Sequence, residues 1–207
     1  MEYGLYLMVA LAAYLLGSLP TGFLAGKARG VDIRAAGSGN IGATNAFRVL
    51  GRKLGTLVLF VDALKGFAAC AGLPWLAGRM WAEAPSQALG LKIVAGIAVI
   101  LGHNFTCWLK FKGGKGIATS GGVLLALAPA AAATAIAVWL VVVLTTRYVS
   151  LASIAAAASM PFAAWFWTGE PVIISALAIL GAMAILKHRS NIRRLLDGME
   201  HRIGEKT

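Results

Sequence analysis

Long uncharged apolar segments recur along the whole chain, and they limit its possible folds more than any other feature. Of its 207 residues, 59% are hydrophobic and only 13% are charged. A soluble domain of ordinary composition is about half apolar and about one quarter charged. Several of the uncharged runs approach the roughly 20 residues that a helix needs to cross a bilayer. The sequence therefore predicts an all-α, polytopic integral membrane protein, with residues 1–207 forming one membrane-embedded domain.

We expect about seven transmembrane helices, at about 4–26, 54–77, 88–108, 116–129, 131–147, 150–168 and 171–187. The first run has no basic segment before it and no A-x-A site after it, which favours a mature span over a signal peptide. Residues 116–147 would make a single helix of about 48 Å, against a hydrocarbon core of about 30 Å. Pro129 near the middle favours a helical hairpin. Each half is short, so a kinked or partly re-entrant pair is an alternative to two full spans.

The placement of the basic residues predicts the orientation. With seven spans, all but Lys65, Arg79 and Lys92 of the 19 lysines and arginines fall on one side. Cytoplasmic loops carry such an excess of basic residues. We therefore expect the N-terminus outside and the C-terminus in the cytoplasm. The net charge of +11 lies beside apolar runs, so it indicates membrane loops, and we expect no nucleic-acid partner.

Three polar, cationic segments interrupt the apolar chain, and the first of them, residues 37–48, is the densest. Its glycines allow backbone N–H groups to point into a common concavity. Its Ser, Thr, Asn and Arg side chains add donors suited to phosphate. A flexible loop is the alternative, but it would not need so many donors. The candidate ligands are Ser38, Gly39, Asn40, Gly42, Thr44, Asn45 and Arg48.

The spacing of residues within this segment leads to two further inferences. Gly37, Gly39 and Gly42 spell G-x-G-x-x-G, but no strand precedes them, so we reject a dinucleotide site. Thr44 and Arg48 are one helical turn apart, and both can face one ligand if a short helix begins near residue 43.

The second polar segment, residues 103–116, contains Gly113-Gly114-Lys115 at the start of an apolar run. It is not a Walker A loop, because that motif needs Ser or Thr after the lysine. Two glycines before a lysine at a helix start still predict an anion site built from N–H groups and the helix dipole. Lys110 and Lys112 are better explained as interfacial anchors. For His103 we expect a structural hydrogen bond.

The third polar segment, residues 187–194, places His188 and Asn191 three residues apart, so both can point towards one ligand. After it, residues 195–203 read as a basic amphipathic helix on the inner leaflet. Inside the second span, Asp62 and Lys65 are also three residues apart. Buried charges in a membrane usually face a partner or a wet cavity, so either an ion pair or a direct role is open.

Four segments resemble the bacterial acyl-phosphate:glycerol-3-phosphate acyltransferase family: GSLPTG (17–22), GSGNIGATNAFRVLG (37–51), GHNFTCWLKFKGGKGIAT (102–119) and KHRSNIRRLLDGME (187–200). The resemblance covers nearly the whole chain, and its three main motifs follow the family order. One departure is Thr106, where many relatives carry proline, which puts the local bend in doubt.

The resemblance implies a multi-pass enzyme of the bacterial inner membrane, with its active site facing the cytoplasm. It implies transfer of a fatty acyl group from acyl phosphate to the 1-hydroxyl of sn-glycerol 3-phosphate. The products would be lysophosphatidic acid and phosphate, in the first acylation step of phospholipid synthesis. It implies no metal, no nucleotide cofactor and no obligatory protein partner, only the two substrates and membrane lipid.

A direct displacement fits both the residues and the resemblance. The chain has no His-x4-Asp dyad and no evident Ser-His-Asp or Cys-His triad, so we expect no covalent acyl-enzyme. The expected catalytic residues are Ser38, Arg48, Lys115, His188 and Asn191. The expected substrate-binding residues are Gly39, Asn40, Gly42, Thr44, Asn45, Gly113, Gly114 and Ser153. The base would be His188 or a phosphate oxygen of the substrate.

Two other functions fit the cationic loops. A transporter or flippase for a phosphorylated or anionic lipid would use similar helix ends, although no internal repeat is visible in the sequence. An acyltransferase that takes its acyl group from a carrier-protein thioester is the second alternative, and it would need to dock a large acidic partner.

Overall fold

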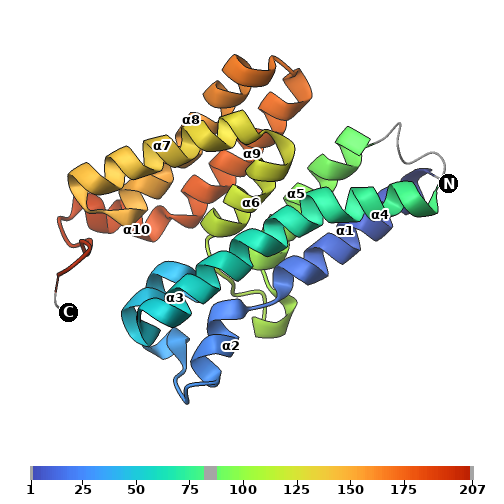
Figure 1. Ribbon diagram of the computed structural model, residues 1–207. Coiled ribbons are helices and arrows are strands. Elements are labelled where there is room, and N and C mark those ends of the chain that lie inside the picture. The colour runs from blue at the N-terminus through green and yellow to red at the C-terminus, as the bar shows by residue number, and fades with distance from the viewer. Residues whose placement is uncertain (1, 82–87, 206–207) are drawn as a thin grey trace. The chain divides into compact units, whose positions relative to one another are not determined.

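The computed structural model describes residues 2–81 and 88–205, and every regular element within these ranges is helical. The all-helical class is therefore confirmed for the described chain. Its contacts group into two compact units, Met1–Leu127 and Ala128–Thr207. The first unit contains α1 (Glu2–Ser18), α2 (Thr21–Lys27), η1 (Ile33–Ala35), α3 (Ala43–Phe67), η2 (Ala68–Gly72), α4 (Leu73–Met80), α5 (Ala88–Asn104), η4 (Cys107–Leu109) and α6 (Ile117–Leu127) (Figure 1). The second contains α7 (Pro129–Thr146), α8 (Val149–Thr168), α9 (Pro171–Lys187) and α10 (Arg189–Leu196).

Within the described residues, five helical stretches are long and apolar enough to cross a membrane: Tyr3–Lys27, Ala43–Met80, Ala88–Leu109, Pro129–Thr146 and Val149–Thr168. A sixth is reached if α9 and α10, bent by 57°, are counted as one span. Helix α6 has 11 residues, and it rises only about 17 Å. The number of seven spans and the orientation of the termini stay predictions.

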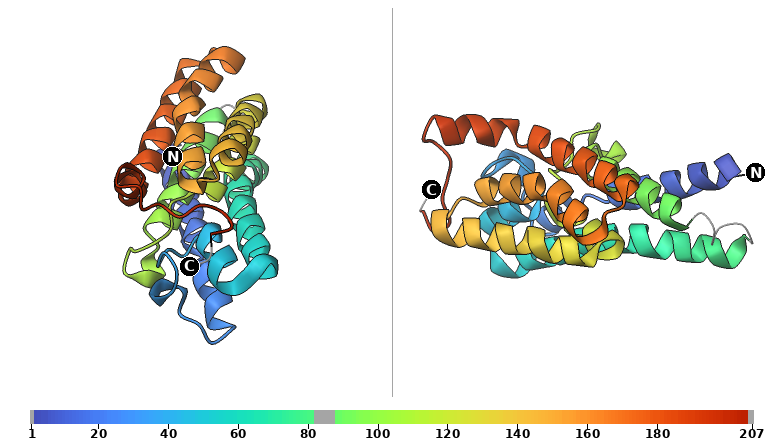
Figure 2. Two further views of the ribbon diagram at one scale, coloured as in Figure 1. Left: turned by 90° about the vertical axis from the view of Figure 1, so that its left-hand side faces the viewer. Right: turned by 90° about the horizontal axis from the view of Figure 1, so that it is seen from above.

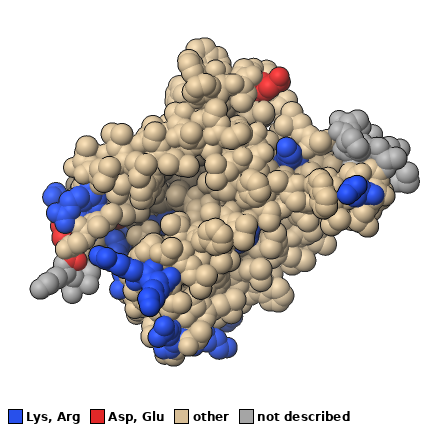
Figure 3. Space-filling model, viewed as in Figure 1, with Lys and Arg blue, Asp and Glu red and all other residues tan. Residues whose placement is uncertain are grey.

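Large apolar side chains cover much of the surface. Leu7, Leu144 and Phe162 are each at least 70% exposed. Most of the face drawn in Figure 3 carries neither acidic nor basic residues. So many exposed large apolar side chains are unusual on a soluble monomer, and lipid tails would solvate them.

In the first unit, glycines let two pairs of helices approach closely. Helix α1 runs beside α5, and α3 runs beside α6 (Figures 1 and 2). A Cβ atom on Gly66 of α3 would lie 2.1 Å from the Thr119 carbonyl oxygen, and one on Gly122 of α6 would lie 1.9 Å from the Ala63 carbonyl oxygen. Gly66 and Gly122 therefore permit the close packing of α3 and α6. A Cβ atom on Gly121 would have no such neighbour within 4 Å, so Gly121 does not share this role.

Gly122→Ala is expected to destabilise the protein, because its methyl group would force α3 and α6 apart. Overpacking of this kind typically costs about 1–3 kcal/mol. The matched control is Gly121→Ala, one residue earlier, where the methyl group meets open space. Thermal unfolding in detergent can be followed in a Cys107→Ser background by the reaction of a thiol dye with Cys70, because Cys70 is fully buried whereas Cys107 is partly exposed. Equal melting temperatures for the two variants would contradict the packing argument.

Helix breaks occur at proline and glycine. Helix α6 ends at Leu127 and α7 begins at Pro129, which confirms the break expected there. Proline at a first helical position sacrifices no intrahelical hydrogen bond, since that N–H would be unpaired anyway. Gly51, at φ 82°, interrupts α3 and leaves a short helix over residues 43–50 before the long span. Its positive φ is readily adopted only by glycine.

The second unit places α8 between α7 and α9 (Figures 1 and 2). After α10 the chain folds back onto the turn between α7 and α8, where the Arg147 guanidinium donates hydrogen bonds to the Ile203 carbonyl. The prediction of an amphipathic helix over residues 195–203 is wrong. Helix α10 ends at Leu196 because Gly198, at φ 70°, reverses the chain and its neighbour Met199 donates its N–H to the Arg194 carbonyl. This is the usual glycine-terminated helix end.

Candidate functional site

Asn45 holds the first polar segment in shape. It is buried, and its Oδ1 accepts the Ser38 N–H at 2.8 Å. Its Nδ2 donates to the carbonyls of Ile33 and Ala36, both at 3.1 Å. These bonds occupy both amide hydrogens, so the side chain supports the loop in this structure. To donate a hydrogen bond to the substrate, Asn45 would have to release one of the two carbonyls.

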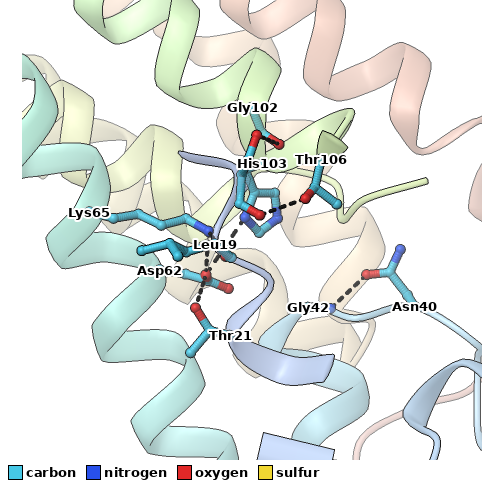
Figure 4. Close-up of polar contacts among 10 residues, drawn as sticks. Leu19, Thr21, Asn40, Gly42, Asp62, Lys65, Gly102, His103 and Thr106 are labelled. Carbon is cyan, nitrogen blue, oxygen red and sulfur yellow. Dashed lines mark hydrogen bonds and ion pairs between the residues drawn. The ribbon is translucent and has the colours of Figure 1, made fainter. Parts of the chain in front are cut away.

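The same loop turns sharply at the predicted ligand positions. Ser38 and Gly39 are exposed, and Gly39 adopts a positive φ of 70°. The Asn40 side chain accepts the Gly42 N–H through Oδ1 at 2.9 Å (Figure 4). This is an Asx-turn, which brings the chain to the start of a helix. Gly42 is the N-cap of α3 and offers no side chain of its own.

Thr44 and Arg48 share one turn of the short helix that opens α3. The helix begins at Ala43, which confirms the expected start, and both side chains are exposed. The positive end of the helix dipole and the first-turn N–H groups lie beside them. Backbone N–H groups, a hydroxyl and a guanidinium are therefore grouped at one helix N-terminus, which is a favourable place for phosphate.

An apolar cluster joins the first and second polar segments. It contains Ile33 and Ile41 from the loop, Ala46 and Val58 from α3, and Leu109 from η4. All five side chains are buried. Because Leu109 lies six residues before Lys115, this cluster holds the second polar segment against the first within one unit.

Gly113 and Gly114 dock onto the end of α5. The Gly113 N–H donates to the Asn104 carbonyl at 3.2 Å, and the Gly114 N–H donates to the His103 carbonyl at 3.0 Å. These amides therefore cap α5 and do not point at a phosphate, contrary to the predicted cradle. Glycine is needed at position 114 because the backbone there packs closely against His103: a Cβ atom on Gly114 would lie 2.1 Å from His103 Nε2. The segment delivers a half-buried Lys115 just before α6 begins.

A buried charge network lies behind this loop (Figure 4). Lys65 Nζ is 2.9 Å from Asp62 Oδ1, which confirms the ion-pair alternative. Thr21 donates to the same oxygen at 3.1 Å, and His103 Nδ1 lies 3.6 Å from it. Lys65 also donates to the Leu19 carbonyl at 3.0 Å. Sequence spacing indicated the pair but not the histidine, which comes from another helix.

Thr106 keeps the bend at the end of α5 in a different way from proline. Its hydroxyl donates to the Ser18 carbonyl at 2.5 Å, and its own carbonyl accepts the Phe111 N–H at 3.0 Å. The residue is buried. The departure from the family pattern therefore leaves a well-bonded turn that also ties α5 to the end of α1.

In the second unit, His188 and Asn191 lie where α9 bends into α10, and both are buried. The His188 ring donates from Nδ1 to the Ala184 carbonyl at 2.8 Å, because a carbonyl can only accept. In the neutral ring this makes Nε2 the acceptor. A histidine in this tautomer is suited to receive a proton from a substrate hydroxyl.

Glu200 is a functional candidate that sequence reasoning missed. It accepts from Asn191 Nδ2 and from Arg194 Nε, each at 2.7 Å. Burial alone would raise the pKa of Glu200, but the hydrogen bonds from Asn191 and Arg194 lower it below its ordinary value. The ionised carboxylate orients the Asn191 amide. The acidic residue within the motif at 187–200 was the available signal.

The Ser153 hydroxyl has different hydrogen-bond partners from those of His188 and Asn191. Its hydroxyl donates to the Val149 carbonyl at 2.8 Å and accepts from Trp139 Nε1 at 3.2 Å. These bonds tie α8 to α7. To donate a hydrogen bond to the substrate, Ser153, a predicted substrate-binding residue, would have to leave the Val149 carbonyl.

Within residues 2–81 and 88–205, no three His, Cys, Asp or Glu side chains are grouped as metal ligands would be. The chemistry that these residues offer is anion binding by Arg, Lys and N–H groups in the first unit, and proton acceptance beside an oriented amide in the second.

Comparison with known proteins gives a consistent result. A family model described as glycerol-3-phosphate acyltransferase matches residues 7–198. The glycerol-3-phosphate acyltransferase of Trichlorobacter lovleyi is 49% identical over 189 residues, covering 91% of this chain and 92% of its own. That of Aquifex aeolicus is 46% identical over 197 residues, covering 95% and 98%.

Two crystal structures resemble the chain closely. PlsY, an integral membrane glycerol 3-phosphate acyltransferase, in its glycerol 3-phosphate form gives a TM-score of 0.86 at 41% identity, covering 96% of both chains. Its lysophosphatidic acid form gives a TM-score of 0.83 at 42% identity, covering 96% of this chain and 95% of that one. The predicted all-helical integral membrane fold is thereby confirmed.

Proposed function

Because the chain belongs to the glycerol-3-phosphate acyltransferase family, we propose that it transfers a fatty acyl group from acyl phosphate to the 1-hydroxyl of sn-glycerol 3-phosphate. The resemblance inferred from the four motifs is confirmed by the match over residues 7–198. Its products are lysophosphatidic acid and phosphate, in the first acylation step of phospholipid synthesis. The active site faces the cytoplasm of a bacterial inner membrane.

The observation that carries this proposal is the joining of two cationic segments by one apolar cluster. Arg48 and Thr44 lie in the short helix that opens α3, which contributes Ala46 to the cluster. Leu109 of the cluster lies six residues before Lys115. Both substrates carry a phosphate, and one carries a fatty chain. A cationic site between apolar helices suits such a pair, because the phosphate is bound by donors while the chain stays in an apolar environment.

We assign the reaction to a single displacement. The hydroxyl oxygen attacks the carbonyl carbon of the acyl phosphate, and the bond from that carbon to the bridging phosphate oxygen breaks. Inorganic phosphate leaves with the electron pair, while Ser38, Arg48 and Lys115 stabilise the growing negative charge. His188 Nε2 takes the hydroxyl proton, and Asn191 positions the glycerol 3-phosphate. A phosphate oxygen of the substrate is the alternative proton acceptor.

The test is phosphate release from palmitoyl phosphate by the purified protein, in detergent or lipid mesophase, with and without glycerol 3-phosphate. We expect release that depends on glycerol 3-phosphate and matches the lysophosphatidic acid formed mole for mole. Release without glycerol 3-phosphate would indicate hydrolysis. No turnover by folded protein, followed by turnover when acyl carrier protein thioester is supplied, would assign the thioester as the donor.

A further inference from the structure

We infer that His103 is a positioning residue for the acyl transfer, which joins the buried Asp62 carboxylate to the glycine pair that carries Lys115. This inference rests on the proposed function, because it assigns Lys115 a part in that reaction. All the contacts that support it lie within the first unit.

One edge of the His103 ring faces α3. Its Nδ1 lies 3.6 Å from Asp62 Oδ1, the oxygen that also receives Thr21 and Lys65 (Figure 4). This distance is an electrostatic contact and is too long for a strong hydrogen bond. His103 and Asp62 are 5% and 2% exposed, so water screens the contact little. The ring is therefore held from the α3 side.

The other edge of the ring faces Gly114. A methyl group on Gly114 would lie 2.1 Å from Nε2, which shows that the glycine backbone packs directly on the imidazole. The His103 carbonyl accepts the Gly114 N–H at 3.0 Å. His103 thus contacts Gly114 through its main chain and its side chain, and Lys115 is the next residue.

The composition of the network supports a positioning role. A buried ion pair often stabilises a fold no more than apolar side chains of the same volume would, because its charges lose their hydration. Asp62 and Lys65 could therefore be replaced by apolar side chains if only helix packing were required. Their location behind the segment that presents Lys115 gives a reason for the charges: they define where the His103 ring sits, and the ring defines where Gly114 sits.

The central experiment is a double-mutant cycle between His103 and Lys115, with kcat and KM measured on palmitoyl phosphate and glycerol 3-phosphate. A catalytic group displaced by about 1 Å can cost about 100-fold in rate, so His103→Leu is expected to lower kcat by about that factor. KM for glycerol 3-phosphate should change far less. In the Lys115→Ala background the same substitution should have little further effect, since residues that act as one unit are not additive.

Three further variants sharpen the result. His103→Asn keeps a donor for Asp62 at the Nδ1 position but lacks the ring edge that packs on Gly114, so it should show the same loss of kcat as His103→Leu. Should His103→Leu not survive extraction, His103→Gln carries the same expected loss, because its amide reaches the Nε2 position only. Thr106→Val is the matched control: it removes a buried hydrogen bond from the same end of α5 without touching Gly114, and should keep the wild-type kcat.

Normal kcat in His103→Leu, or an undiminished loss on top of Lys115→Ala, would overturn the inference. A readout that needs no turnover separates it from the proposed function: the rate at which an amine-reactive reagent labels Lys115, read by peptide mass spectrometry. We expect this rate to change in His103→Leu and to stay at the wild-type value in Thr106→Val. An unchanged rate in both would also overturn the inference, whatever the substrate.

Discussion

Lys115→Ala is expected to lower kcat/KM for acyl transfer by about 100- to 1000-fold, the usual effect of removing one preorganised donor from a developing negative charge. The same loss is expected for Arg48→Ala, since its guanidinium offers a second fork of donors to phosphate. Both variants should keep the melting temperature of the wild type in detergent, because Arg48 is exposed and Lys115 is half-buried.

Each variant has a matched control close by in the sequence. Lys112 lies three residues before Lys115 and Arg52 lies four residues after Arg48, and both are exposed. Lys112→Ala and Arg52→Ala should keep kcat/KM within about threefold of wild type, as expected of surface charges that contact no substrate. Equal losses in a variant and its control would mean that total positive charge matters, and would remove the individual assignment.

His188→Ala is expected to lower kcat at saturating substrate by about 100-fold or more, within the range of a lost general base. His188→Asn isolates the acceptor nitrogen. Its amide can still donate to the Ala184 carbonyl, as Nδ1 does at 2.8 Å, but it offers no atom at the Nε2 position. We therefore expect both variants to lose kcat equally, with His188→Asn closer to the wild type in melting temperature.

The kinetic parameter that changes decides the role of His188. A loss confined to KM would make it a binding residue and would leave the proton to a phosphate oxygen of the substrate. A normal kcat in His188→Asn with a low kcat in His188→Ala would mean that the ring serves only to brace α9 through Ala184.

Much of the fold could be predicted from local patterns. The uncharged runs indicated membrane helices, and Pro129 marked the break between α6 and α7. Thr44 and Arg48 indicated a short helix, which α3 contains. These features depend on neighbours within one or two helical turns, which the sequence displays directly. The prediction of a helix over residues 195–203 is wrong for a local reason too, because Gly198 adopts a positive φ and ends α10.

The roles of individual polar groups depended on distant partners. Gly113 and Gly114 were expected to bind phosphate through their N–H groups, but those groups cap α5. Asn45 was expected to bind substrate, yet its amide braces a loop that begins 12 residues earlier. In each case the residue lies in a polar segment that the sequence displays, while its hydrogen-bond partner could be identified only once the chain had folded.

The sequence by itself determined that this chain is an apolar helical membrane protein with cationic, glycine-rich segments suited to phosphate, because composition and periodicity act locally. The tertiary structure alone decided which polar groups meet. The Asp62 carboxylate accepts a hydrogen bond from Thr21, 41 residues earlier in the chain, and faces His103 from another helix. The Glu200 carboxylate orients the Asn191 amide after a glycine reverses the chain. A buried polar atom must find a partner wherever packing places one, and that requirement is met in space, without regard to distance along the chain.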